Sequence, residues 1–173
     1  MNRTIEDLLN RRSVRSFTDE PVSKEELEIL VQSGMNAPSG GNRQPAIMVV
    51  VQDEETINQL ERLNYEAVGN PPGKPFYGAK TVIVVLADKK VSTRVYDGAL
   101  VMGNLMNAAY ALGLGSCWIH RAKETFETEE GRALLAKWGI EGEYEGIGNL
   151  IVGHVAGEFP PAKAKKENYV YWV

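Results

Sequence analysis

The sequence predicts an α+β fold in which helices cover both faces of a mixed β-sheet. Runs of β-branched and aromatic residues alternate along the chain with amphipathic segments of helical period, and no linker or repeat interrupts them. The helical segments outnumber the crossovers that a simple parallel sheet needs, which disfavours a doubly wound fold. A length of 173 residues suits one domain, residues 1–173, because domains commonly contain about 100–200 residues.

Capping residues mark where the helices begin. Thr4, with Asp7 three residues later, is expected to cap a first helix. Ser23 and Glu26 form a capping box, in which each side chain accepts a hydrogen bond from the other residue's backbone amide, and the helix should end near Gly34. Asp53 is expected to cap a third helix. Further helices are predicted over roughly 95–112, with so little polar surface that we expect it to be buried, and over 129–138.

Strands are predicted at 47–51, 81–86, 116–119, 150–155 and 169–173. The last of these places Tyr169, Tyr171 and Trp172 at the end of the chain, where ends usually fray. Two interpretations remain open. The segment is either an edge strand of its own sheet or a strand that adds to a second copy and gives an intertwined homodimer.

Composition excludes several classes of protein. Because 19 Lys and Arg oppose 23 Asp and Glu, the formal charge is −4, and the absence of a long basic block argues against nucleic acid as a partner. No apolar run reaches the roughly 18 residues that span a bilayer, and no signal-peptide pattern is present, so we expect no membrane association and a cytoplasmic location. Cys117 with His120 and His154 cannot supply a disulfide framework or a Cys/His zinc site.

Two polar segments carry candidate ligand-binding residues. Three guanidiniums and two hydroxyls lie within residues 11–16, a set suited to holding a phosphate or another oxyanion, although such arginines can also simply complement the negative end of a helix. Residues 37–45 contain stiffening prolines, glycines that admit close backbone approach, and amide and hydroxyl groups suited to a polar heterocycle. An ordinary Pro/Gly/Asn turn is the alternative for this second segment.

Two later segments, taken alone, are less specific indicators of a binding site. Residues 113–121 contain Gly-x-Gly, but the dinucleotide-binding pattern needs a third glycine where Trp118 stands, so that motif is absent. Cys117 is expected to be a buried structural thiol, because His120, three residues along a strand, would point to the opposite face. Lys163, Lys165 and Lys166 follow Pro160-Pro161 and form either a solvated segment or a second clamp on an anion.

Taken together, these segments resemble the FMN-dependent nitroreductase family from Arg11 to about Lys165. The matching motifs are Arg-Arg-Ser-x-Arg-x-Phe, Pro-Ser-x-x-Asn-x-Gln-Pro, a helix with Asn104 that leads into Gly-Leu-Gly-Ser-Cys-Trp-Ile, then Val-Gly-His and Pro-Pro-x-Lys-x-Lys. The resemblance implies a three-layer α-β-α sandwich, an obligate homodimer with FMN at its interface, and a C-terminal strand exchanged between the subunits.

The resemblance also implies roles for individual residues. Phosphate binding falls to Arg11, Ser13, Lys163 and Lys165; the flavin ring is contacted by Arg12, Arg15, Trp118, Ile119 and His120, and from the partner chain by Pro38, Ser39 and Gly40, with Asn42 holding that loop. Arg15 has an electrostatic role at the pyrimidine edge. No dedicated catalytic side chain and no metal ion are expected, because the flavin carries the chemistry.

The activity implied is an FMN-dependent oxidoreductase that passes hydride from NADH or NADPH to small electron-poor acceptors, such as nitroaromatics or quinones, by a ping-pong mechanism. Other reductive reactions on the same scaffold remain alternatives: dehalogenation, enone reduction and flavin fragmentation. A protein that binds FMN with little turnover and a colourless structural dimerisation module are further alternatives.

Overall fold

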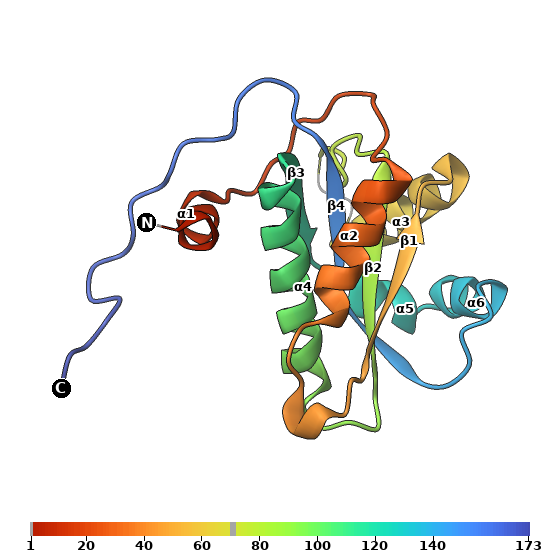
Figure 1. Ribbon diagram of the computed structural model, residues 1–173. Helices are drawn as coiled ribbons and strands as arrows, with labels where there is room; N and C mark the ends of the chain where they lie inside the picture. Colours follow the sequence, from red (N-terminus) through yellow and green to blue (C-terminus); the bar gives the residue numbers. More distant parts are fainter. Residues whose placement is uncertain (1, 70–71) are drawn as a thin grey trace.

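A computed structural model describes residues 2–69 and 72–173 of the chain. At its centre lies a four-stranded sheet with strand order β1-β2-β4-β3 (Figure 1). The strands are β1 (Ala46–Val51), β2 (Thr81–Asp88), β3 (Leu114–Ile119) and β4 (Tyr144–His154). The predicted α+β class is confirmed.

Neighbouring strands of this sheet all run antiparallel, so the expected mixed sheet is wrong. The chain leaves β1 at Val51 and re-enters the sheet beside it, where Val51 pairs with Val82 of β2. Between them, α3 (Glu54–Glu66) leads away and the following segment returns to the same end of the sheet, which reverses the strand direction. Among the described residues, parallel pairing is confined to an isolated bridge between Ser13 and Ser116.

Helices cover both faces of the sheet, as expected, and give three layers (Figure 1). Side chains of β2 alternate between the two faces: Ile83 and Val85 pack on one side, Val84 and Leu86 on the other, and all four are fully buried. The first face is covered by α2 (Lys24–Met35) and α4 (Arg94–Ala111), and the second by α3, α5 (Ala122–Glu127) and α6 (Glu129–Lys137). A further helix, α1 (Arg3–Asn10), contacts α4.

Hydrogen bonds at the helix starts test the predicted caps. The capping box of Ser23 and Glu26 is present, and Asp53 accepts a hydrogen bond from the backbone of Thr56 at 2.8 Å, so both of these caps are confirmed. The cap of α1 is Asn2 and not Thr4, because the Asn2 amide oxygen accepts from the backbone of Ile5 at 3.1 Å. The six-residue α5 was not predicted; no side chain caps it.

The longest helix, α4, is buried along one side only, which corrects the expectation of a buried central helix. Met102 and Leu105 are fully enclosed, whereas Tyr96 is 74% and Leu100 47% exposed. The helix stops before Gly113, whose φ of +81° is the left-handed conformation that terminates helices. Neither α4 nor any other described helix is long and apolar enough to cross a membrane.

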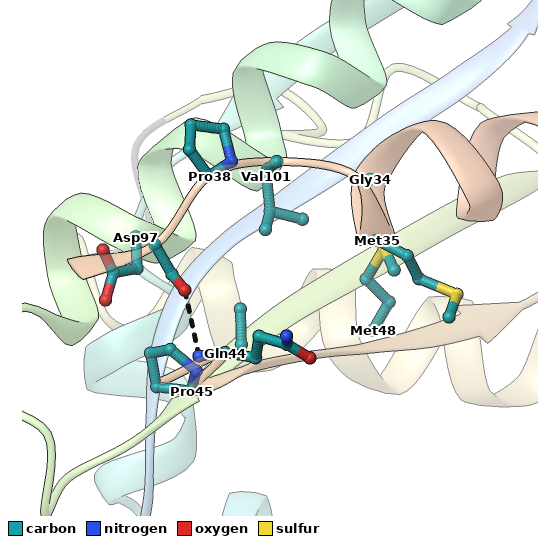
Figure 2. A pocket seen from close by; sticks show the side chains of 11 residues that line it. Gly34, Met35, Pro38, Gln44, Pro45, Met48, Asp97 and Val101 are labelled. Carbon is teal, nitrogen blue, oxygen red and sulfur yellow. Dashed lines mark hydrogen bonds between the residues drawn. The ribbon is translucent and has the colours of Figure 1, made fainter. Parts of the chain in front are cut away.

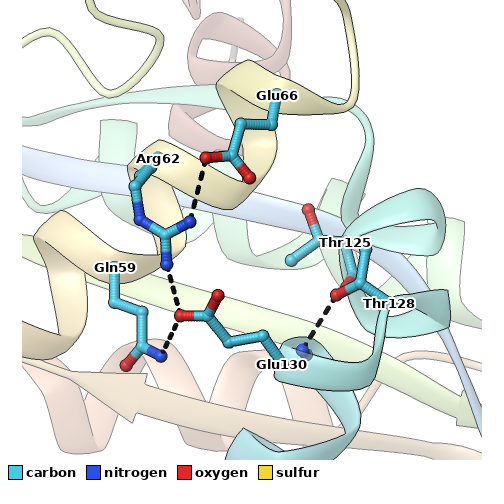
Figure 3. Close-up of polar contacts among 7 residues, drawn as sticks. Gln59, Arg62, Glu66, Thr125, Thr128 and Glu130 are labelled. Carbon is cyan, nitrogen blue, oxygen red and sulfur yellow. Dashed lines mark hydrogen bonds and ion pairs between the residues drawn. The ribbon is translucent and has the colours of Figure 1, made fainter.

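Polar contacts fasten the outer layer of helices (Figure 3). The Arg62 guanidinium on α3 pairs with Glu66 one turn along and with Glu130 on α6, and Gln59 donates to the same Glu130 carboxylate at 2.6 Å. The Thr128 hydroxyl accepts from the Gly131 amide at 2.9 Å and so caps α6. These contacts join α3 to α6 across the surface of that layer.

The predicted C-terminal strand does not form within a single chain. Residues 157–173 run as an extended tail past α1, away from the sheet (Figure 1), and residues 169–173 are exposed, Trp172 by 93%. An edge strand of the chain's own sheet is therefore excluded. A strand needs hydrogen bonds from a neighbouring edge, and none of the four described strands offers one to this tail. Exchange with a second subunit stays a prediction.

Candidate functional site

The segment after α1 is held in an extended form between β3 and the end of β4. Val14 donates a backbone hydrogen bond to Ser116 at 2.9 Å, and Thr18 donates one to His154 at 2.9 Å. Val14 is 1% exposed because it packs against Gly115, where an added Cβ would lie 2.8 Å from the Val14 side chain. A glycine on β3 thus lets this segment lie close to the sheet.

Alternation along the extended segment places Arg11, Ser13 and Arg15 on the side opposite the buried Val14. These three residues line a cleft of about 530 Å³, which the C-terminal tail closes from the other side with Lys163 and Lys165. Arg12 and the pair Pro160-Pro161 complete its lining, and we call it the cationic cleft. The structure therefore brings together six predicted site residues from both ends of the chain.

Charge distinguishes the cationic cleft from the rest of the molecule. Five of its lining residues are Arg or Lys, and none of the lining residues in the described chain carries a carboxylate, although the chain has a net charge of −4. The Nη1 atom of Arg11 is buried and has no hydrogen-bond partner among residues 2–69 and 72–173. A buried donor without an acceptor costs free energy, so this cleft is suited to an anionic group that supplies acceptor oxygens.

Arg12 differs from its neighbours in what it contacts. Its Nη1 atom donates to the backbone carbonyls of Leu9 at 2.8 Å and Arg11 at 2.7 Å, at the C-terminal end of α1. The alternative interpretation of the arginine cluster, that a cation complements the end of a helix, therefore holds for this residue. A direct contact from Arg12 to a bound ligand stays a prediction.

Arg15 lies at the rim of the cleft against an aromatic residue that sequence reasoning missed. Its Cζ atom is 5.8 Å from the centre of the Tyr77 ring. Tyr77 precedes β2 and is distant in sequence, and no pattern around it indicated a role, because Pro75-Phe76-Tyr77-Gly78 resembles an ordinary turn.

The second predicted segment, residues 37–45, forms a tightly braced loop (Figure 2). The Ser39 hydroxyl accepts from the backbone of Gln44 at 3.0 Å, and the Gln44 side chain donates to Asn42 at 2.9 Å. Asn42 and Gln44 both adopt positive φ, which the short polar side chain of Asn tolerates. The predicted role of Asn42 in bracing the loop agrees with this contact.

A buried carboxylate on α4 ties this loop to the helix. Asp97 is 4% exposed; it accepts from the backbone of Gly40 at 2.9 Å and from the Thr93 hydroxyl at 2.7 Å. A Cβ at Gly40 would lie 2.9 Å from that hydroxyl, so a larger residue there would have to displace the Thr93 side chain. The sequence analysis did not identify Asp97; an acid in the first turn of a helix usually interacts with the helix dipole.

The braced loop lines a separate cavity of about 170 Å³ between α2, α4 and β1. Figure 2 shows Pro38 and Asp97 on one side, Gln44 and Pro45 below, and Met35 and Met48 closing the apolar end. Within one chain, Pro38 and Ser39 line this cavity and not the cationic cleft. Their predicted contact with a ring bound in the partner's cleft stays a prediction.

Trp118, Ile119 and His120 lie at the end of β3 and do not line the cationic cleft of their own chain either. The indole of Trp118 occupies the space above Gly148, where an added Cβ would collide with Nε1. The His120 carbonyl accepts from the buried Asn64 side chain at 2.6 Å, which fixes the backbone as it leaves the strand. Cys117, on the opposite face, is 2% exposed and free, in agreement with a structural thiol.

Comparison with known proteins gives these features a family context. The profile of the nitroreductase family matches residues 8–154, and an Archaeoglobus fulgidus protein provisionally named an NADH dehydrogenase/NAD(P)H nitroreductase is 33% identical over 125 residues, covering 69% of this chain and 68% of that protein. An FMN reductase [NAD(P)H] from Bacillus subtilis is 33% identical over 135 residues, covering 67% of this chain but only 53% of the reductase.

Solved structures agree with this assignment. A Bacteroides fragilis nitroreductase with bound FMN superposes with a TM-score of 0.90 at 25% identity and covers all of both chains. The match to the nitroreductase family spans both the arginine segment and the braced loop, and the fold agrees over the full length. The chain therefore belongs to the nitroreductase family.

Proposed function

We propose that the chain binds FMN in the cationic cleft and passes hydride from NADH or NADPH to a small electron-poor acceptor, such as a nitroaromatic or a quinone. The observation that carries this proposal is the convergence of Arg11, Lys163 and Lys165, from opposite ends of an acidic chain, on one cleft without acidic lining among the described residues. Relatives whose names include FMN reduction support it.

The lining of the cleft suits the phosphate of FMN. A phosphate monoester carries nearly two negative charges at neutral pH and three strong acceptor oxygens. Arg11, Lys163 and Lys165 offset this charge, and the unpartnered Arg11 Nη1 gains the acceptor that it lacks. The Ser13 hydroxyl lies on the same side of the extended segment and adds a neutral donor.

The protein's own residues bind and orient the cofactor and tune its surroundings. FMN held by these residues would supply the hydride-transfer chemistry between the reduced nicotinamide and the acceptor. Arg15 holds a positive charge at the rim of the cleft, where it stabilises negative charge that develops nearby. Donor and acceptor use one site in turn, so ping-pong kinetics are expected. Solvent supplies the protons, so no side chain needs to act as a general acid.

We propose further that the working unit is a homodimer with exchanged C-terminal tails. The tail ends in exposed aromatic residues, and the outer side of α4 exposes Tyr96 and Leu100. Leu8 and Leu9 on α1, which contacts α4, are also 50% and 59% exposed. Such a dimer would cover these apolar side chains and supply the braced loop, with Pro38 and Ser39, to the partner's site.

A visible spectrum of the purified protein tests the proposal most directly. Flavin absorbance that is retained through desalting, followed by steady NADH or NADPH oxidation with menadione or a nitrofuran, is the expected result. A coloured protein without turnover would favour an FMN-binding role or another reductive reaction, such as dehalogenation or enone reduction. A colourless protein that takes up no added FMN would refute the proposal.

Size-exclusion chromatography with light scattering tests the dimer, since deletion of the aromatic tail should yield monomers.

We also propose a cytoplasmic location, with which the free thiol of Cys117 is compatible. Cell fractionation with an antibody against the protein measures the location.

A further inference from the structure

Tyr77 occupies a backbone conformation that its side chain disfavours. Its φ is +52°, and the next residue, Gly78, has a φ of +73°. A bulky residue at positive φ is uncommon, because its Cβ approaches the backbone carbonyl oxygen. Strain of this kind persists only where the surrounding structure imposes it, and it is enriched at functional sites.

The surroundings of Tyr77 show what imposes this conformation. Phe76 is 1% exposed in the core beneath α3, and its backbone amide donates to the Glu61 carboxylate at 2.8 Å. Ala79, 3% exposed, donates to the Phe76 carbonyl at 3.0 Å and closes the turn. With Phe76 and Ala79 anchored in the core, the turn between them leaves the Tyr77 ring on the surface, 44% exposed.

The ring meets the guanidinium of Arg15, whose Cζ lies 5.8 Å from its centre. Arg15 lines the cationic cleft, and it has no hydrogen bond or ion pair with any side chain in the part of the chain that the structure describes. An aromatic face attracts a guanidinium without accepting a hydrogen bond in the guanidinium plane, so the N–H donors stay free for another partner. A carboxylate at the same place would occupy those donors and neutralise the charge.

We propose that Tyr77 is a positioning residue that holds the Arg15 guanidinium at the rim of the cationic cleft, charged and with its N–H donors directed to a bound flavin. This inference rests on the proposed function for the nature of the ligand. The contact between ring and guanidinium belongs to the chain itself and can be measured without any cofactor.

Three variants distinguish the effect of the aromatic ring at residue 77 from the effect of its backbone strain. Tyr77→Phe keeps the aromatic face. Tyr77→Asn removes the face but suits the positive φ, so its melting temperature should not fall below that of the wild type. Arg15→Ala removes the cation and provides the background for a double-mutant cycle.

The first measurement uses the protein without FMN. In nitrogen-15 NMR, the Arg15 side-chain N–H resonance, assigned by its loss in Arg15→Lys, should be shifted by the ring in wild type and Tyr77→Phe. It should move to the position of a free arginine in Tyr77→Asn. The same resonance position in all three proteins would overturn the contact, whether or not the protein binds FMN.

The second measurement follows flavin reduction by NADH or NADPH in the FMN-loaded protein by anaerobic stopped flow. Tyr77→Asn should slow reduction by about two- to fivefold, the effect of one exposed cation–π contact, with FMN affinity little changed. Tyr77→Phe should restore the rate, and Tyr77→Asn should have no further effect once Arg15 is alanine. Equal slowing in both backgrounds, or a Tyr77→Phe variant as slow as Tyr77→Asn, would overturn the proposal. Failure of the wild type to take up FMN would instead refute the proposed function and leave the NMR result to decide the contact.

Discussion

Substitution of Arg11 and of Arg12 by alanine forms a matched pair that tests how the cationic cleft binds its ligand. Both residues line the cleft, but Arg11 has a buried nitrogen without a partner, whereas Arg12 already donates to two backbone carbonyls. Hydrogen bonds to a charged group contribute about 1.5–3 kcal/mol each. Arg11→Ala should therefore raise the Kd for FMN by about 10- to 150-fold, and Arg12→Ala should raise it much less.

Quenching of flavin fluorescence by the apoprotein measures both affinities. Riboflavin, which lacks the phosphate, serves as the control ligand: its Kd should be nearly the same for wild type and Arg11→Ala if Arg11 acts on the phosphate. Arg12→Ala should chiefly lower the melting temperature, because the end of α1 loses its cation. An Arg12→Ala variant that weakens FMN binding as much as Arg11→Ala would refute this division of roles. An equal loss of riboflavin binding would refute the phosphate assignment.

Substitutions at three further positions follow from individual contacts. Gly115→Ala should lower the free energy of unfolding by about 1–3 kcal/mol in urea titration, because the new Cβ would lie 2.8 Å from Val14. Asp97→Ala, measured in the same way, should cost about 1–3 kcal/mol by leaving two half-buried donors without their acceptor, and Asp97→Asn should recover part of this because the amide keeps an acceptor oxygen. Burial raises the pKa of Glu26, but hydrogen bonds from Ser23 outweigh this and hold the pKa below its ordinary 4.5. A depressed folded-state pKa stabilises the protein above the unfolded value and ceases to do so as the pH falls through the folded value. Glu26→Gln should therefore be less stable than wild type at about pH 7, with the difference shrinking towards about pH 3 in urea titrations at both.

Local chemistry made most of the helices predictable. Ser23 and Asp53 each satisfy backbone amides within one turn, so their caps could be read without knowledge of the fold. Asn2 and Thr4 are both suitable caps two residues apart, and the sequence does not rank them. Helix α5 could not be predicted because it has only six residues and no capping side chain marks its first turn. It follows Arg121 at φ +78°, a conformation that the surrounding structure imposes.

The halves of the candidate site differ in how far the sequence could predict them. The spacing of Arg11, Ser13 and Arg15 by two residues matches one face of an extended segment, so this half depends on a local pattern. What the sequence could not supply is long-range contact: Tyr77 beside Arg15, and Asp97 beneath the braced loop, are each set by packing of elements more than fifty residues apart. The antiparallel pairing of β2 with β1 is likewise a contact between separate elements, which no local sequence pattern determines.

The two halves of the cationic cleft are also held with unequal strength, and this has a thermodynamic consequence. Backbone hydrogen bonds hold the arginine half to β3 and β4, whereas among the described residues the last such bond near the tail is donated by Ala156, just before the tail begins, to Ser16. Beyond it, Phe159 packs against Tyr110 with ring centres 5.0 Å apart, and Lys163 and Lys165 follow on an exposed segment. Ordering each residue of a free segment costs about 1–2 kcal/mol, so the lysine half opposes ligand binding unless something else holds the tail. A partner subunit that pairs with the aromatic end would order the tail before the ligand binds. Because dilution below the dimer dissociation constant removes that partner, FMN affinity should then fall. An FMN affinity that is independent of protein concentration across that range, in a protein shown to dissociate there, would mean that the tail is held by its own chain.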